Sequence, residues 1–508
     1  MTVELPPEIW DIIAQHFQGQ QLISLMGVNR TFMVHAMKEK YRVLSLVWLT
    51  DRVLKRLEIL SKEDYIAEHV KSVSLQYILI PGVLARKPLP SHPFHRKLKS
   101  FAAKAYKKLT PSRGGKAKIT FDEASELISK VLPRLKYLTE VTVNYGESAV
   151  ESPVPSIPWN IYSHTLRTLH LWISSITEIE AHHLPLDIDF PQLSELSIRL
   201  DHARKCTALV SPPEISKIIA FINRFQKTLT SLTFVNREEG DIWQGAFNSL
   251  GYFPNLTSVD LDTIKGDFGF LARHADSLQE LKYSYSFFSE ALLPIEFTKL
   301  KNVSLFAYAS APIGWWVSPS PFIQSILHTV RTLQLGRWCS SDDVTAFLST
   351  ATAIAQGRAS GLPLEELSMT LRSLSPVVLP SLAGAFPQLR TLEIYIHELV
   401  TDGADPIIPD EFFPSFGENS EWEDTPFIVH LQGALAGVRW GLEDISIKRR
   451  GCCYEPIIWG LMIICAQFIP SISSFDSQGD MSVPDYIRIP ADFSETLLMK
   501  HGHIAWES

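Results

Sequence analysis

Two short groups of residues carry side chains that could take part in chemistry. Gly114-Gly115-Lys116 has the composition of a phosphate-binding loop, but the earlier glycine is missing and Ala117 stands where Ser or Thr would bind Mg²⁺. His182 and His183 are adjacent, yet no cysteine is nearby and no helical His-Glu-x-x-His arrangement surrounds them. We therefore interpret the first group as a basic loop and expect no metal at the second.

The cysteines give no better case for chemistry. Cys452 and Cys453 follow Lys448-Arg449-Arg450, whose charges can lower a thiol pKa, but buried structural cysteines are far more frequent than reactive ones. No Gly-x-Ser-x-Gly elbow and no dinucleotide fingerprint is present. We predict a non-catalytic chain with no cofactor, no metal and no catalytic residue, so its function should be binding.

The composition of the chain limits which partners it could bind and which compartment it could occupy. A net charge of −8 over 508 residues gives no reason to expect nucleic acid. The longest apolar run, residues 456–468, is too short to span a bilayer, and the N-terminus lacks the basic and apolar regions of a signal peptide. The five cysteines are odd in number and are not spaced as pairs of metal ligands, which fits a reducing compartment. We expect a cytoplasmic or nuclear protein that does not contact a membrane.

The first forty residues predict three short helices. Pro6 and Pro7 suit the first turn of a helix, and Glu8 lies where the positive end of the helix dipole favours a carboxylate. Apolar residues then recur at helical spacing, and Asn29 can cap a third helix that carries Phe32. So short a segment cannot bury all of this apolar surface, so we expect another part of the chain or a partner to cover it.

At these residues the sequence resembles the F-box family, whose pattern runs Leu-Pro-x-Glu, then apolar positions, then Val, a small or polar residue, a basic residue and an aromatic one. The only departure is Asn29, where the family usually has Ser or Cys. The resemblance implies docking onto the Skp-type adaptor of a cullin-RING ubiquitin ligase. The residues expected to bind the adaptor are Leu5, Pro6, Glu8, Ile9, Ile13, Phe17, Leu22, Leu25, Val28, Arg30 and Phe32. The alternative is an ordinary three-helix cap on a larger domain.

The rest of the chain repeats one spacing, in which apolar residues fall at the first, fourth and sixth places. The copies are Tyr41-Leu44-Leu46, Val70-Val73-Leu75, Leu138-Val141-Val143, Leu166-Leu169-Leu171, Leu193-Leu196-Ile198, Leu229-Leu232-Phe234, Leu256-Val259-Leu261, Leu278-Leu281-Tyr283, Leu300-Val303-Leu305, Val330-Leu333-Leu335, Leu364-Leu367-Met369, Leu389-Leu392-Ile394, Leu442-Ile445-Ile447 and the weaker Ile472-Phe475. They lie roughly 22 to 36 residues apart for the most part, against about 20 to 29 in regular leucine-rich repeats.

This pattern resembles the degenerate leucine-rich repeats that many fungal proteins join to an F-box. The resemblance implies an α/β fold: a three-helix F-box followed by an irregular solenoid, with parallel strands on its concave face and helices on its convex face. Apolar stripes at residues 53–60 and 215–225 fit such returning helices. We divide the chain into an F-box-like module at 1–40, first repeats at 41–80, an insertion at 81–120 and a repeat domain at 121–508.

Two stretches interrupt the repeats. Residues 81–120 carry many Lys and Arg residues and no acidic residue, whereas residues 401–426 are acidic, proline-rich and contain three phenylalanines. The first is either a solvated insertion or a binding site for an acidic partner, a phosphorylated target or RNA. The second is either a functional loop or a disordered one.

Alternate strand residues should face solvent and present a surface of mixed charge with a few aromatics, which suits protein recognition. The target-binding candidates are Trp172, Arg199, Asp262, Lys282, Phe306 and Tyr395. We therefore expect the substrate-recognition subunit of an SCF-type (Skp, cullin, F-box) ubiquitin ligase, which holds an unidentified target protein on the repeats. The alternative is a repeat scaffold without ligase association, whose N-terminal helices cap the solenoid.

Overall fold

The computed structural model describes residues 5–17, 19–47, 50–76, 121–145, 157–173, 184–200, 212–236, 246–262, 268–285, 290–307, 320–339, 341–357, 361–401, 426–449 and 456–476. The insertion predicted at 81–120 and nearly all of the acidic stretch at 401–426 lie outside these residues. The chain divides into two compact units, Met1–Leu229 and Thr230–Ser508. Among the described residues, the first unit contains the N-terminal helices and five strands, and the second contains nine strands.

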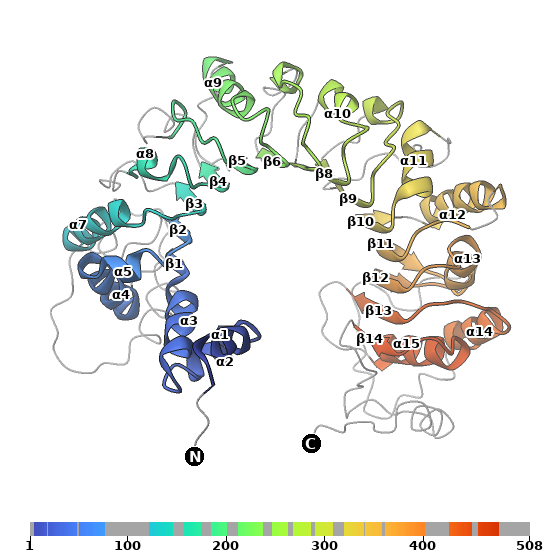
Figure 1. Ribbon diagram of the computed structural model, residues 1–508. Coiled ribbons are helices and arrows are strands. Elements are labelled where there is room, and N and C mark those ends of the chain that lie inside the picture. Colours follow the sequence, from blue (N-terminus) through green and yellow to red (C-terminus); the bar gives the residue numbers. More distant parts are fainter. Residues whose placement is uncertain are drawn as a thin grey trace, which may run out of the picture. The chain divides into compact units, whose positions relative to one another are not determined.

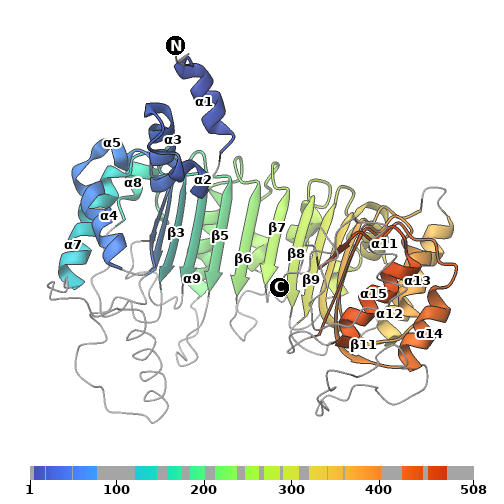
Figure 2. The same ribbon diagram turned by 90° about the horizontal axis from the view of Figure 1, so that it is seen from below.

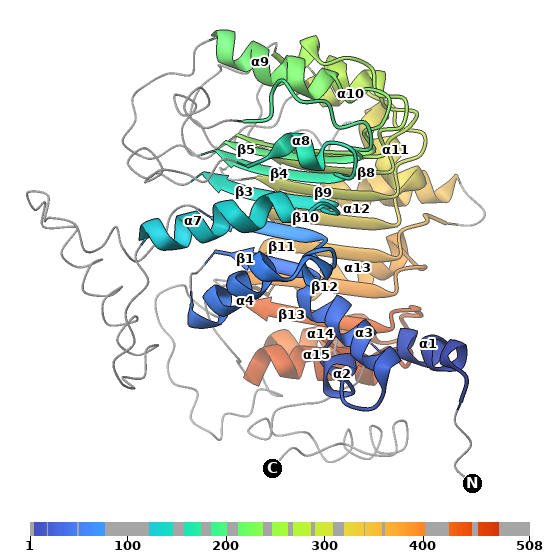
Figure 3. The ribbon, with the colours of Figure 1, turned by 60° about the vertical axis from the view of Figure 1, so that its left-hand side comes forward.

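Three short helices open the first unit: α1 (Pro7–Gln15), α2 (Gly19–Ser24) and α3 (Arg30–Tyr41). We call residues 5–41 the head. Gly19 has φ +50°, which an L side chain rarely adopts, where the chain turns from α1 into α2. The Asn29 side chain accepts a hydrogen bond from the Phe32 N–H at 2.9 Å, so it caps α3 as the sequence predicts. Figures 2 and 3 show α1 standing clear of the strands of this unit.

The strands of the first unit pair in parallel and in sequence order. They are β1 (Val43–Leu46), β2 (Ser72–Gln76), β3 (Glu140–Tyr145), β4 (Thr168–Ile173) and β5 (Glu195–Leu200). One backbone hydrogen-bond pattern recurs at the start of the strands. The Lys71 carbonyl accepts hydrogen bonds from the N–H groups of Thr139 and Glu140, at 2.9 and 3.0 Å. The Arg167 carbonyl does the same for Ser194 and Glu195, at 2.9 and 3.0 Å. Each strand therefore sets where the next one begins.

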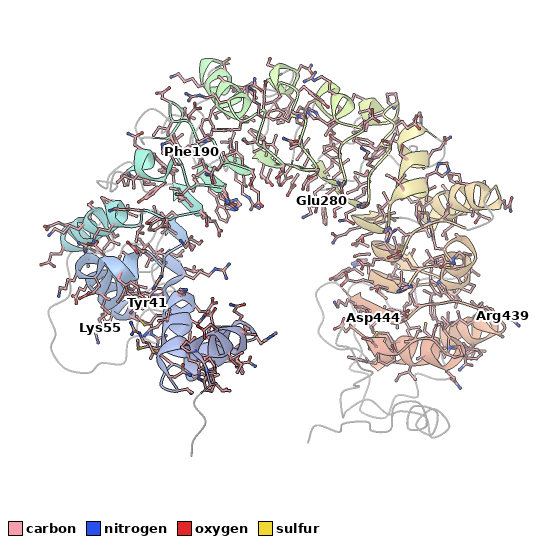
Figure 4. All side chains as sticks on the ribbon, viewed as in Figure 1. Tyr41, Lys55, Phe190, Glu280, Arg439 and Asp444 are labelled. Atoms are coloured by element: carbon pink, nitrogen blue, oxygen red, sulfur yellow. The ribbon has the colours of Figure 1, made fainter. Side chains whose placement is uncertain are left out.

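Helical segments cover one side of these strands (Figure 1). They are α4 (Asp51–Lys62), α5 (Asp64–Ala67), α7 (Phe121–Val131), the 3-10 turn η2 (Leu132–Arg134), α8 (Trp159–Tyr162) and α9 (Pro212–Asn223). The stripes predicted at 53–60 and 215–225 fall in α4 and α9. Between helices and strands, the Phe190 ring lies 6.2 Å from the centroids of both Trp159 and Phe225 (Figure 4).

The nine strands of the second unit also pair in parallel and in sequence order. They are β6 (Ser231–Asn236), β7 (Ser258–Asp262), β8 (Glu280–Tyr285), β9 (Asn302–Ala307), β10 (Thr332–Cys339), β11 (Glu366–Leu374), β12 (Thr391–Leu399), β13 (Asp444–Arg449) and β14 (Ser474–Phe475). The pairing of β10 with β11 shifts register between Leu335 and Trp338, where β10 carries extra residues.

Helical segments again lie on one side of the strands of the second unit (Figures 1 and 2). They are η5 (Ala246–Ser249), α10 (Gly269–Arg273), η6 (Glu290–Leu292), α11 (Pro321–Thr329), α12 (Ser341–Gln356), α13 (Val378–Ala385), α14 (Pro426–Leu435) and α15 (Pro456–Phe468). The apolar run 456–468 forms α15, whose Leu461 and Cys465 are fully buried. Among the described residues, no helix is both long and apolar enough to cross a bilayer.

The repeated apolar spacing locates the strands correctly. Every copy coincides with one strand, including the weakest at Ile472-Phe475, and every apolar residue of the copies is at most 4% exposed. Residues in corresponding places of the copies pair across strands. For example, Val259 of β7 pairs with Leu281 of β8, which pairs with Val303 of β9. The structure confirms the prediction of a parallel α/β repeat fold with helices on one side of the strands.

Candidate functional site

The head has a small core of its own. Leu22 and Phe32 are 5% and 3% exposed, and the Phe32 ring meets the rings of Trp10 and Phe17 edge to face at 5.8 and 5.9 Å. We predicted both Leu22 and Phe32 to contact the adaptor. That prediction is wrong for their side chains, because the head encloses them; their role is to hold α1, α2 and α3 together.

Five large apolar side chains of the head remain exposed, and we call them the head surface. Their exposed fractions are 39% for Leu5, 41% for Ile9, 54% for Ile12, 55% for Val28 and 46% for Met33. Leu5, Ile9 and Val28 belong to the predicted adaptor-binding set, whereas Ile12 and Met33 do not. Ile12 lies three residues after Ile9 on the same helix, and this spacing could have predicted that the two side chains share one face.

The other predicted adaptor residues divide into two groups. Pro6, Glu8 and Arg30 are exposed, and Glu8 lies in the first turn of α1 as expected. Ile13, Phe17 and Leu25 are half-buried because they pack against the core of the head.

A polar contact between α1 and α3 holds the head together. His35 Nε2 lies 2.5 Å from Asp11 Oδ1. The hydrogen bond from His35 is the main reason that the pKa of Asp11 is lower than usual.

In the first unit the solvent-facing side of the strands places Trp172 and Arg199 together. The two residues are register partners on β4 and β5, and the Arg199 guanidinium carbon lies 5.0 Å from the centre of the Trp172 ring. Asn144 of β3 is the partner of Trp172 on the other side. Two residues earlier on β4, His170 is half-buried, and burial is the main reason that its pKa is lowered. Trp172 and Arg199, both predicted as target-binding candidates, thus form a cation–π contact.

In the second unit Tyr395 belongs to a charged cluster at the end of the strand order. Lys448 Nζ lies 3.0 Å from Glu393 Oε1 and 2.9 Å from Asp476 Oδ1, and the Tyr395 hydroxyl donates to Glu393 at 2.9 Å. Burial lowers the pKa of Lys448, but its hydrogen bonds to the two carboxylates outweigh this effect and raise it. The sequence analysis identified Tyr395 as a target-binding candidate but did not single out Lys448 or Asp476.

The other three candidates of the second unit have separate surroundings. Lys282 pairs with Glu280 on its own strand at 3.2 Å, and Figure 4 shows Glu280 on the side of the strands away from the helices. The Phe306 ring lies against Gly336 of β10 so closely that a Cβ at this glycine would overlap it. Asp262 is 7% exposed, so the solvent-facing position that we predicted for it is wrong.

The groups first considered for chemistry, Gly114 to Lys116, His182-His183 and Cys452-Cys453, lie outside the described residues. Within the described part of the chain, no group of three or more His, Cys, Asp or Glu side chains could hold a metal ion. Cys339 and Cys465 are buried free thiols, and burial raises the pKa of Cys465 to about 12.

Comparisons with known proteins add no relative: no protein-family model and no curated protein matches the chain. Support for a function therefore comes from the motifs of the sequence and from the head and strand surfaces described above.

Proposed function

We propose that this chain is the substrate-recognition subunit of an SCF-type ubiquitin ligase. The head surface would bind a Skp-type adaptor, and the solvent-facing sides of the strands would bind a target protein. The observation that carries the proposal is the exposed apolar surface of the head, in the segment whose motifs resemble an F-box.

Exposed apolar side chains are concentrated in the head. Thirteen large apolar residues are exposed among the described residues, and five of them fall between Leu5 and Met33. Scattered apolar residues are normal on a soluble protein, whereas a concentration of them marks a contact with another polypeptide. The enclosed core at Leu22 and Phe32 also matters, because it keeps α1 and α3 in place without using the exposed residues.

In this role the chain would supply proximity. Holding a target and a ubiquitin-charged enzyme in one assembly raises their effective concentration, so the chain itself needs no reactive group. Catalysis would belong to other subunits.

The direct test is co-purification of the full chain with a Skp-type adaptor, compared with Leu5→Ala/Pro6→Ala. We expect the wild-type chain to elute with the adaptor and the double variant to elute alone with an unchanged melting temperature. Val429→Ala, which changes a residue of α14 that is 52% exposed, is the matched control and should keep the adaptor. A wild-type chain that is monodisperse alone and does not bind the adaptor would refute the proposal.

One observation favours a second function, a repeat scaffold that the head caps. The last residue of α3, Tyr41, is 4% exposed, the Arg56 guanidinium of α4 lies 5.1 Å from its ring centre, and β1 begins at Val43. The head therefore contacts the first repeat. Removing residues 1–40 separates the two functions. Loss of a cap should lower solubility and melting temperature, whereas loss of a docking module should leave a folded chain that no longer binds the adaptor.

A further inference from the structure

The two charged groups on the strand surfaces differ in how their charges are paired. In the second unit, Lys448 contacts both Glu393 and Asp476, and Ser446 donates to Asp476 at 2.6 Å. In the first unit, the Arg199 guanidinium lies over the Trp172 ring, and within the described part of the chain its Nε is buried without a hydrogen-bond partner. A buried donor without a partner is costly unless a ligand supplies the acceptor. Of these two cations, Arg199 is therefore the one that has no carboxylate partner among the described residues.

The charges around Arg199 are arranged along the strands. Glu140 of β3, Thr168 of β4 and Glu195 of β5 are register partners at the start of their strands. The Thr168 hydroxyl donates a hydrogen bond to the Glu195 carboxylate at 3.3 Å. Arg199 lies four residues further along β5, which corresponds to about 13 Å at the usual rise of a strand. His170 of β4 is influenced by charges at both ends of this surface. Burial has the largest effect and lowers its pKa; Glu140 and Glu195 raise the pKa, and Arg199 lowers it. The surface is therefore acidic at one end and cationic at the other.

We propose that this surface, formed by Glu140, Trp172, Glu195 and Arg199, binds an extended segment of the target protein that carries one acidic and one basic side chain. The carboxylate of the segment accepts hydrogen bonds from Arg199, and its basic side chain lies against Glu140 and Glu195. In an extended peptide these two side chains are about four residues apart. The inference rests on the proposed function, because it specifies what the repeats of a substrate receptor would recognise.

The geometry favours a carboxylate over a phosphate. A guanidinium presents parallel N–H groups in a plane that matches a carboxylate, and the guanidinium carbon of Arg199 lies 5.0 Å from the centre of the Trp172 ring. A phosphate group carries close to two negative charges. Here it would meet one guanidinium, with the carboxylates of Glu140 and Glu195 on the same surface. A singly charged carboxylate is the better match in charge.

The test is selection from a displayed library of random twelve-residue peptides on the immobilised full-length chain. We expect enrichment of Asp or Glu at one position and of Lys or Arg four positions away. With Arg199→Glu the acidic preference should disappear and a basic one should replace it. Arg199→Lys should keep the acidic preference while weakening the selected peptides about tenfold, because the ammonium cannot bind the carboxylate with two parallel hydrogen bonds. Arg199→Gln, which has no charge, should lose the preference.

Lys55→Glu is the matched control. It reverses a charge in the same unit, but on α4, where Figure 4 shows Lys55 far from the strands, so the selected peptides should not change. Melting temperatures verify that each variant is folded. Selected acidic peptides that bind Arg199→Glu as tightly as wild type would overturn the proposal, as would a selection without any enriched pattern. A second library with a fixed phosphoserine covers the remaining case: peptides that bind only when phosphorylated would show that a carboxylate is not the ligand.

Adaptor co-purification of the same preparations keeps the two proposals distinguishable. A chain that binds the adaptor but selects no acidic peptide contradicts only this inference. A chain that selects acidic and basic pairs but ignores the adaptor contradicts only the ligase assignment.

Discussion

The head surface allows a quantitative prediction for Ile9→Ala/Ile12→Ala. Burying an isoleucine side chain completely is worth about 1.5 to 3 kcal/mol. Ile9 and Ile12 are 41% and 54% exposed, so about half of each remains to be buried by a partner. Docking therefore gains about 1 kcal/mol from each residue. The double variant should lose about 1.5 to 2 kcal/mol of binding free energy, because alanine keeps part of the contact, and this corresponds to about ten- to thirtyfold in the dissociation constant.

The stability of the chain should respond differently from its affinity. Substitutions at exposed positions usually change the free energy of unfolding by less than about 0.5 kcal/mol, and alanine is the better helix former. Titration calorimetry with the purified Skp-type adaptor measures the affinity, and a thermal melt measures the stability. Leu22→Ala serves as a contrast: it removes a buried side chain of the head and should cost about 2 to 5 kcal/mol of stability.

Two results would refute this reasoning. An adaptor affinity within about twofold of wild type would show that Ile9 and Ile12 are not in the interface. A large fall in melting temperature for the double variant would show that these residues pack against the chain itself, which contradicts their exposure in the structure.

Three further predictions concern stability. Gly336→Ala should lower the free energy of unfolding in urea by about 1 to 3 kcal/mol, because its Cβ would overlap the Phe306 ring, whereas Gly384→Ala in α13 meets no atom and should be neutral or stabilising. Asn29→Ala should cost about 1 kcal/mol through loss of the cap of α3, read as a lower melting temperature of the head, with Asn29→Ser as the variant that keeps a capping side chain. His274 is buried, and its Nε2 accepts the Phe253 N–H at 2.9 Å while Nδ1 donates to the Phe270 carbonyl at 2.7 Å. Burial lowers its pKa, so the unfolded chain binds a proton first as the pH falls below about 6.5, and stability should decrease by up to about 1.4 kcal/mol per pH unit until the pH passes the lowered folded pKa. Urea midpoints at pH 7.5 and 5.5 test this, and an unchanged pH dependence in His274→Gln would contradict it. The lowered pKa of Asp11 contributes only in a more acidic range, below about pH 4, so the two effects separate.

The strand positions were predictable because the signal for them is local. Each copy of the apolar spacing needs only six residues to define which side chains face the helices, and each strand pairs with the strand formed by the neighbouring copy. For this reason even the degenerate copy at Ile472-Phe475 located a strand. The cap at Asn29 was predictable on the same grounds, since the donor is three residues away.

The surfaces were less predictable because their members come from different repeats. Twenty-seven residues separate Trp172 from Arg199, and fifty-three separate Tyr395 from Lys448, by their numbers in the chain. The repeat spacing places Trp172 beside Arg199 and Tyr395 beside Lys448. No local pattern shows which contacts these side chains make, or that Asp476 joins Lys448 after β14.

The sequence alone thus determined where the strands lie and that a short apolar segment precedes them, because alternation and helical spacing are properties of a few consecutive residues. Only the tertiary structure decided which apolar residues of the head are enclosed and that Asp262 is buried. It also showed that Arg199 lies over Trp172 and that its Nε has no hydrogen-bond partner among the residues the structure describes. Burial and pairing depend on what the rest of the chain places beside a residue, and that information is spread over several repeats.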